Sequence, residues 1–169
     1  MVMVTLATPW DNPNLALFHG TVDRYVESIQ RGIDLRWARK GTDFGRGFYL
    51  TTSEGQARDW AISRAEDLGG KPAVLRFDVS RDAISELDTL WFVRADSTAI
   101  DYWRFVRHCR RGRDHVRRSS NDRYDMVVGP VAVGWRRKLE TLPHSDQAGF
   151  HTARATTLLD ASRPEMLPW

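Results

Sequence analysis

Residues 43–52 read DFGRGFYLTT, a polar, glycine-containing segment that leads into an apolar run. The run at 47–51 predicts a short strand, and Gly45 and Gly47 allow the backbone before it to approach a ligand closely. A capping-box pattern follows at Ser53-Glu54-Gly55-Gln56 and predicts the start of a helix. On its own, the stretch is equally compatible with a simple turn that enters a strand.

Upstream of this stretch, residues 15–18 predict a buried strand that ends at His19-Gly20-Thr21. Apolar residues at helical spacing then predict a helix over 22–29, with Gly32 at its C-cap. The polar, glycine-containing residues 34–46 are expected to form a loop.

Downstream, the order of predicted elements becomes richer in strands toward the C-terminus. This order favours a single α+β domain over a doubly wound sheet. Residues 80–94 are ambiguous, and 112–123 are expected to form a polar loop. We expect strands at 73–79, 124–128 and 148–151, and helices from 53, at 101–111 and at 152–159.

The chain has 169 residues, which suits one domain with a core at about 15–155 and short tails. No apolar run approaches the roughly 20 residues that span a bilayer, and residues 1–13 lack the pattern of a signal peptide. The single cysteine, Cys109, excludes an internal disulfide and disfavours a cysteine-based metal site. We therefore expect a cytoplasmic protein with no membrane association and no bound metal.

Positive charge is clustered although the formal net charge is only +3. Seven arginines and two histidines between Arg104 and Arg118 face one acid, Asp114. A second cluster is Arg136-Arg137-Lys138. These clusters are compatible with a solvated face or with a surface that attracts a polyanion such as NAD phosphates, nucleic acid or an acidic partner.

His19, Tyr49 and Trp60 form a spacing pattern that is more informative than any one of these residues alone. His19 ends a predicted strand, Tyr49 lies in a glycine-flanked strand, and Trp60 follows eleven residues later, on the expected inner face of a helix. Each by itself is compatible with a structural role. Together they resemble the NAD site of ADP-ribosyltransferases, in the histidine–tyrosine branch that includes diphtheria-type toxins and poly(ADP-ribose) polymerases.

A nearer resemblance is to small bacterial proteins of this type that are thought to be toxins of toxin–antitoxin pairs or conflict systems. The likeness spans about residues 15–155. The segments that carry it are Phe18-His19-Gly20-Thr21, residues 43–52, Gln56-Ala57-Arg58-Asp59-Trp60-Ala61, Trp103-Arg104-Phe105-Val106 and residues 124–132.

The resemblance implies two small sheets, mixed or antiparallel, around an NAD cleft with flanking helices, and NAD as co-substrate. His19 would bind the adenosine-side ribose, and the Gly20 backbone would bind the carboxamide of nicotinamide. Tyr49 and Trp60 would sandwich the nicotinamide ring. The implied cofactor-binding residues are His19, Gly20, Thr21, Arg46, Gly47, Phe48, Tyr49 and Trp60, with Arg39, Lys40 or Arg46 near the pyrophosphate.

The family plan places a glutamate at the start of a late strand, where it holds the nicotinamide ribose and stabilises positive charge in the transition state. Here the matching residue is Gln147, so the implied catalytic residues are His19, Tyr49 and Gln147. Because glutamine carries no charge, weaker catalysis is expected. Asp146 would point to the opposite side of the strand, and Glu140 lies earlier in the chain.

The function expected from this resemblance is transfer of ADP-ribose from NAD to a protein or nucleic acid, recruited by the segment from Arg104 to Arg118. Such a bacterial toxin would have a cognate antitoxin protein. One alternative is a weak or inactive module of the same fold that binds NAD, ADP-ribose or RNA. Others are a nucleic-acid-binding scaffold and an RNA 2′-phosphotransferase, which would need phosphate-binding residues in place of the Tyr49 clamp.

Overall fold

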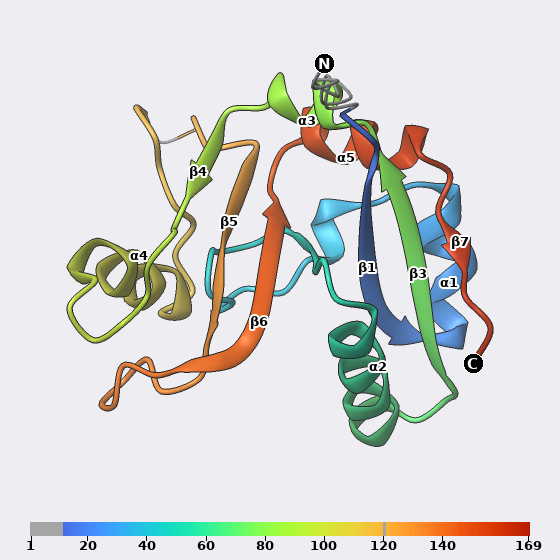
Figure 1. The fold of residues 1–169 in the computed structure, drawn as a ribbon, viewed down its shortest axis with the longest axis horizontal. Helices are drawn as coiled ribbons and strands as arrows, with labels where there is room; N and C mark the ends of the chain where they lie inside the picture. Colours follow the sequence, from blue (N-terminus) through green and yellow to red (C-terminus); the bar gives the residue numbers. More distant parts are fainter. Residues whose placement is uncertain (1–11, 120) are drawn as a thin grey trace, which may run out of the picture.

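The computed structural model describes residues 12–119 and 121–169. Figure 1 shows β1 and β6 in the centre of the molecule, with α4 and α1 at opposite sides. The elements follow in the order β1 (Leu15–Val22), α1 (Asp23–Arg31), the 3₁₀ helix η1 (Leu35–Trp37), β2 (Phe48–Leu50), α2 (Glu54–Leu68), β3 (Pro72–Val79), α3 (Arg81–Ser85), β4 (Thr89–Trp91), α4 (Ile100–Arg110), β5 (Met126–Ala132), β6 (Thr141–Phe150), α5 (Ala153–Ala161) and β7 (Glu165–Met166).

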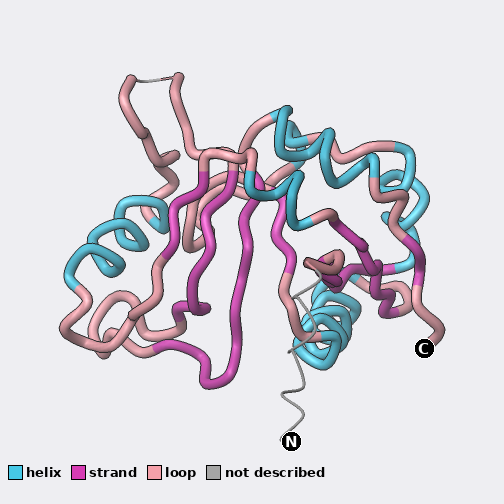
Figure 2. Tube along the Cα trace, turned by 45° about the horizontal axis from the view of Figure 1, so that its top comes forward, coloured by secondary structure: helices cyan, strands magenta, loops and turns pink. Residues whose placement is uncertain are grey.

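The strands form two small sheets, as Figure 2 also shows. The first is antiparallel, with order β1-β3-β7, and β1 pairs with β3 along its whole length. The second has order β2-β6-β5-β4 and is antiparallel except where β4 runs parallel to β5. The α+β class and the two mixed or antiparallel sheets predicted from the sequence are therefore confirmed.

One backbone bridge joins the two sheets. The Phe18 N–H donates to the Thr51 carbonyl over 2.8 Å, and the Thr51 N–H donates to the Phe18 carbonyl over 2.9 Å. This bridge places the middle of β1 beside the end of β2. As a result, residues from the N-terminal strand and from the glycine-flanked strand lie next to each other.

Apolar side chains form three clusters around this junction. The largest lies between the sheets and includes Leu17, Phe77 and Phe150. A second lies under α4, where Phe44 packs among aromatic side chains of the helix and of β4–β5. The third fixes α2 against β1 and β3 through Ala57, Ala61 and Val74.

Several predicted boundaries are wrong. β1 continues through His19-Gly20-Thr21 to Val22, because these residues pair with β3 up to Pro72. β5 continues through Gly129-Pro130, where a register irregularity between Pro130 and Ala132 accommodates a residue that has no N–H to donate. β6 begins at Thr141 rather than near 148. It pairs with β5 at Thr141 and again from Asp146 to Phe150, and its largely polar first half has no apolar pattern to mark it.

The helix ends agree with the sequence more closely. Gly32 caps α1 with φ 148° and donates to the Ile29 carbonyl. Ser53 caps α2 by accepting from the Gln56 N–H over 3.2 Å. The reciprocal half of the capping box is absent, because the Gln56 amide bonds the backbone of Asp146 and so ties α2 to β6. Across the described ranges, none of the helices is long and apolar enough to cross a membrane.

Candidate functional site

His19 lies where β1 meets β2. Its ring stacks on Phe48 with the centroids 4.3 Å apart, and its Nδ1 lies 2.8 Å from the Tyr49 carbonyl oxygen. A carbonyl only accepts, so Nδ1 carries the proton. Burial lowers the pKa of His19 to about 4, so the ring is neutral at pH 7 and Nε2 offers a lone pair. Within the described residues, no donor occupies Nε2.

Gly20 lets α2 approach β1 closely. A Cβ at this position would lie 2.1 Å from the Ala57 carbonyl oxygen and 2.9 Å from the Ala61 nitrogen. The two alanines therefore occupy the inner face of α2, and Trp60 is 45% exposed. The expectation that Trp60 lies on the inner face is wrong, because only small side chains fit against Gly20. Its exposed indole is available to stack on a ligand.

Arg64 follows Trp60 by one helical turn, so the two side chains share one side of α2. Burial lowers the pKa of Arg64, and the nearby charge of Arg39 lowers it further. The charge of Arg64 also contributes to the lowered pKa of His19. Sequence reasoning missed Arg64, although its i+4 spacing from Trp60 was the available signal. Arg64 thus brings a positive charge to the neighbourhood of His19, and Arg39 brings one to the neighbourhood of Arg64.

Arg46 is bound into the fold. Its guanidinium lies 3.6 Å from the Asp114 carboxylate, and its backbone N–H donates to the same carboxylate over 3.1 Å. Its carbonyl accepts from Nδ1 of His151. Gly47 is required by the same packing, since a Cβ there would lie 2.5 Å from His151 Nδ1. Thr21 is only 5% exposed. In this structure the contacts of Arg46 and Gly47 and the burial of Thr21 hold the fold together, and their role in cofactor binding stays a prediction.

The Tyr49 hydroxyl fixes the loop before β2. It donates to the Gly45 carbonyl over 2.6 Å, accepts from the Phe44 N–H over 3.2 Å, and lies 2.9 Å from the Thr42 hydroxyl. Burial raises the pKa of Tyr49 above its usual value. The ring packs against Phe44 and, edge to face, against His151. Tyr49 and Trp60 do not pair directly among the described aromatic contacts, as is needed if another ring is to lie between them.

Asp43 is the buried charge behind this loop. Its carboxylate is 3% exposed and accepts from Arg110 Nε over 2.6 Å, from the Ala132 N–H over 2.8 Å and from Gln147 Nε2 over 2.6 Å. The acid lies within the stretch that predicts β2, but its partners lie far along the chain. Sequence reasoning assigned it no role; an acidic residue between apolar and glycine residues was the only local signal.

Gln147 is oriented by these contacts. Its Nε2 donates to Asp43 and, over 3.0 Å, to the Pro130 carbonyl. Both partners only accept, so both amide hydrogens are used and the orientation of the amide is fixed. Oε1 points away from them and receives no hydrogen bond from the described residues. The adjacent Asp146 instead bonds Thr51 and Thr52 and links β6 to β2.

Tyr49 and Gln147 share one face of the second sheet. Tyr49 pairs with Gly149, and Gln147 lies two residues from Gly149 along β6. Residues two apart on a strand point to the same side, and a diagonal cross-strand pair is within reach of long side chains. At the junction between the sheets, His19 and Gly20 lie beside Tyr49. Tyr49 shares its sheet face with Gln147, and Trp60 lies on the helix that packs against Gly20.

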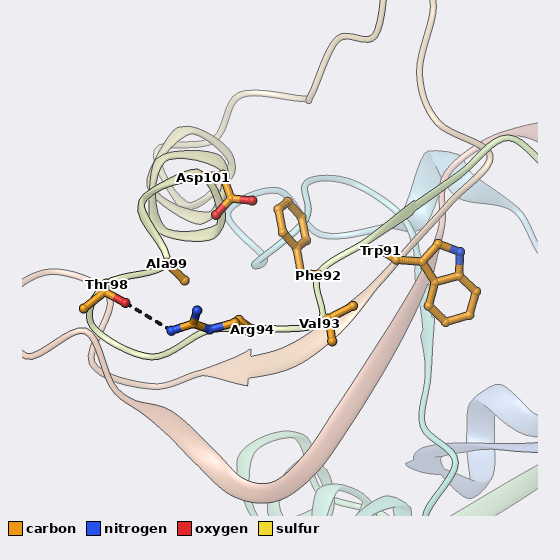
Figure 3. Close-up of a pocket in the computed structure, with 7 residues that line it drawn as sticks. All are labelled: Trp91, Phe92, Val93, Arg94, Thr98, Ala99 and Asp101. Atoms are coloured by element: carbon orange, nitrogen blue, oxygen red, sulfur yellow. Dashed lines mark hydrogen bonds between the residues drawn. The ribbon is translucent and has the colours of Figure 1, made fainter.

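Two cavities lie away from this junction. One, of about 400 Å³, is lined mainly by the connection from the end of β4 to the start of α4. Figure 3 shows its Arg94 hydrogen-bonded to Thr98, and the guanidinium is also paired with Asp96 over 2.7 Å. A second cavity, of about 360 Å³, is lined by Arg107, Arg111, Trp135 and Arg136.

Cys109 and the acidic and histidine side chains do not form a metal centre in the described residues: no cluster of three or more potential ligands has the geometry to hold an ion. Cys109 is buried, and burial followed by the charges of Asp114 and Asp43 raises its pKa to about 12. The thiol is therefore protonated and unreactive at neutral pH.

Comparison with known families identifies one match. The model of the family described as "Protein of unknown function (DUF3990)" matches residues 15–134, so the chain belongs to this family. The match runs from β1 through β5 and ends before Gln147. No curated protein matches the chain.

Proposed function

We propose that this member of the DUF3990 family binds NAD at the junction of its two sheets and transfers ADP-ribose to a macromolecular acceptor. The observation that carries the proposal is the meeting of β1, β2, α2 and β6 at one place. There, Nε2 of His19 and Oε1 of Gln147 have no hydrogen-bond partner among the described residues. Nδ1 of His19 and Nε2 of Gln147 are held by hydrogen bonds within the fold. The resemblance to ADP-ribosyltransferases assigns these same positions to the donor site.

The side chains around His19 suit a dinucleotide. A neutral imidazole with a fixed tautomer accepts a hydrogen bond from a ribose hydroxyl. Trp60 offers an exposed ring for stacking, and Arg39 and Arg64 supply positive charge for a pyrophosphate. In this proposal Arg64 takes the place that Arg46 was expected to fill, because Arg46 is engaged by Asp114.

Gln147 is the residue proposed to act on the nicotinamide ribose. The reaction breaks the bond between that ribose and nicotinamide; the bonding pair leaves with nicotinamide, and positive charge develops on the sugar. The Asp43 carboxylate and the Pro130 carbonyl each accept one amide hydrogen of Gln147, and the charge of Asp43 thereby increases the negative character of Oε1. A polarised amide oxygen stabilises developing positive charge less than a carboxylate does. We therefore expect slow turnover.

A binding module of the same fold is the second candidate. It is favoured by the same Gln147, because this residue carries no charge and the carboxylate that holds its amide nitrogen, Asp43, is 3% exposed and already accepts from three donors. In that case NAD or ADP-ribose binds at the junction without cleavage. The two candidates share the donor site and differ only in whether nicotinamide is released.

The test is nicotinamide release from NAD by the purified protein, alone and with added RNA, DNA or cell lysate, together with calorimetric titration of NAD. Trp60→Ala is the informative variant, because the side chain is exposed and its loss leaves the core intact. Ile62→Ala is the matched control, since Ile62 lies on the same helix and is 43% exposed.

Release that is lost in Trp60→Ala and retained in Ile62→Ala supports the transferase. NAD binding without release under any condition contradicts the transferase and supports the binding module. Absence of NAD binding at millimolar concentration contradicts the transferase, and absence of ADP-ribose binding in the same titration contradicts the binding module as well.

A further inference from the structure

The fold brings the two basic clusters of the sequence together. Arg107 and Arg111 lie four residues apart at the C-terminal end of α4, and Arg136 follows β5 in the connection to β6. A hydrogen bond of 3.3 Å from Arg107 Nε to the carbonyl of Trp135, the residue before Arg136, joins the helix to this connection. These four residues line the cavity of about 360 Å³. Figure 1 shows α4 and the turn between β5 and β6 at the same side of the molecule.

The three arginines of this cavity are not neutralised by neighbours. Among the described residues, none of them forms a salt bridge, whereas Arg110 on the same helix is paired with Asp43, and Arg117 with Asp88. The cavity at β4 shows the opposite arrangement, because its Arg94 is paired with Asp96. Unpaired guanidinium groups around a hollow attract phosphate groups and bind them through forked donors.

Trp135 adds an aromatic wall to this charge. The guanidinium carbon of Arg136 lies 5.0 Å from the centre of the Trp135 ring, so cation and indole form a layered pair. Aromatic rings and guanidinium planes both stack on nucleobases, and the combination with a positive groove is typical of single-strand binding. The cavity is also within the size range of pockets that hold a small ligand or one nucleotide.

We propose that the surface formed by Arg107, Arg111, Trp135 and Arg136 binds single-stranded nucleic acid, with phosphates on the arginines and a base stacked on Trp135. The Trp135 ring can stack on the face of an unpaired base, whereas the bases of a duplex are already stacked on their neighbours. The proposal concerns binding only and does not depend on the NAD chemistry proposed above.

The experiment measures fluorescence anisotropy of a labelled single-stranded RNA or DNA of about 12 nucleotides, a length that covers one typical site. The full chain is titrated over a range of salt concentrations. Variants are Trp135→Ala and Arg111→Ala. The matched controls are Trp37→Ala, since Trp37 is 86% exposed in η1, and Arg31→Ala, since the Arg31 side chain is 72% exposed on α1.

Trp135→Ala is expected to weaken binding by about tenfold or more, as loss of one base–aromatic stack does. Arg111→Ala is expected to reduce the slope of log affinity against log salt by about 0.7, the value for one phosphate contact on a single strand. Circular dichroism of each variant verifies that the fold is retained. Both controls are expected to bind like the unchanged protein.

Three outcomes overturn the proposal. One is binding that Trp135→Ala and Arg111→Ala change no more than their controls do. Another is equal affinity for duplex DNA with no effect of Trp135→Ala, which would indicate contact with the backbone of a duplex. The third is displacement of the oligonucleotide by poly-glutamate of matched charge as effectively as by unlabelled oligonucleotide, which would indicate an acidic protein partner.

Discussion

His19 and His151 make nearly the same bonds and yet lie in different environments. Each donates from Nδ1 to a backbone carbonyl of the segment around β2: His19 to Tyr49 over 2.8 Å, and His151 to Arg46 over 2.9 Å. Burial lowers both pKa values, to about 4 and about 3. The second nitrogen distinguishes them, because Nε2 of His151 is buried without a partner. Only His19 offers a lone pair outward.

The difference teaches that a candidate binding residue is better recognised by a polar atom left free for a ligand than by the hydrogen bonds that its side chain already makes. Gln147 follows the pattern of His19, with one end held by the fold and the other free. His151 is closed on all sides by Gly47, Gly149 and the edge of Tyr49. The residues whose second atom remains open are those that the resemblance places at NAD.

The largest effect is expected from closing the space around His151. In Gly47→Ala, the new Cβ would lie 2.5 Å from His151 Nδ1 and 2.8 Å from the Phe150 carbonyl oxygen. We expect the free energy of unfolding to fall by about 3 kcal/mol, as for severe overpacking, measured by urea denaturation. Gly55→Ala is the control, because its nearest neighbour is 3.8 Å away and alanine suits a helix. Equal stability of the two variants would contradict the close packing around His151.

Replacing each histidine by alanine separates their roles. His151→Ala is expected to lower the free energy of unfolding by about 2–3 kcal/mol, because it empties a buried space. His19→Ala is expected to cost only about 1 kcal/mol of stability, from one lost hydrogen bond, and to abolish NAD binding in calorimetry. If His19→Ala binds NAD like the unchanged protein, the proposed difference between the two histidines is wrong.

Gln147→Glu tests the residue that shares the pattern of His19. The new carboxylate would lie next to the Asp43 carboxylate, where Gln147 Nε2 is now 2.6 Å away, and the two charges would repel. We expect a loss of about 2 kcal/mol in unfolding free energy, as for a buried hydrogen bond replaced by unpaired groups. Adding Asp43→Asn restores a donor to this pair.

In the double variant, part of the lost stability should return and nicotinamide release should be faster than in the unchanged protein, because the charge now lies at the open position. Double-variant stability no higher than that of Gln147→Glu alone would show that the two side chains are not coupled.

The stability of the unchanged protein is also expected to depend on pH. Burial lowers the pKa values of His19, His115 and His151. Below about pH 6.5 the unfolded chain therefore binds more protons than the folded protein does. The stabilisation is complete above the unfolded pKa of about 6.5 and is lost as the pH falls toward 4, by about 1.4 kcal/mol per pH unit for each of His19 and His151. In His151→Phe, the fall in unfolding free energy per pH unit should be smaller by the contribution of one histidine. Denaturation curves between pH 7 and 4 measure it, and an unchanged slope would contradict the burial of a neutral His151.

Local patterns predicted much of the fold. The spacing of apolar residues indicated α1 and β3, and Gly32 and Ser53 marked helix ends that the structure confirms. β6 was predicted too short, because its first half is polar and is recognised only through its pairing with β5. Trp60 shares a helical face with Ala57 and Ala61 in periodicity, and only the contact with Gly20 decides which of them turn inward.

The candidate site was less accessible to sequence reasoning. His19, Tyr49 and Gln147 were selected through the resemblance, and no local pattern indicated that they would be neighbours. Asp43 and Arg110 are 67 residues apart, so their ion pair leaves no periodic signal. The same holds for the contact between Arg107 and Trp135, which joins two charge clusters whose spatial relation the sequence left open.

The single carboxylate of Asp43 has a consequence for motion. It joins the segment before β2 to α4, β5 and β6, so residues 42–46 should exchange their amide hydrogens only when the core opens. Residues 34–41 lack this anchor and include the exposed Trp37 and Arg39. Gly41, with φ 75°, is the last residue before the anchored part. We therefore expect residues 34–41 to move independently of 42–46, on the nanosecond-to-microsecond timescale of surface loops, and so to be the part of this segment that adapts to the proposed dinucleotide.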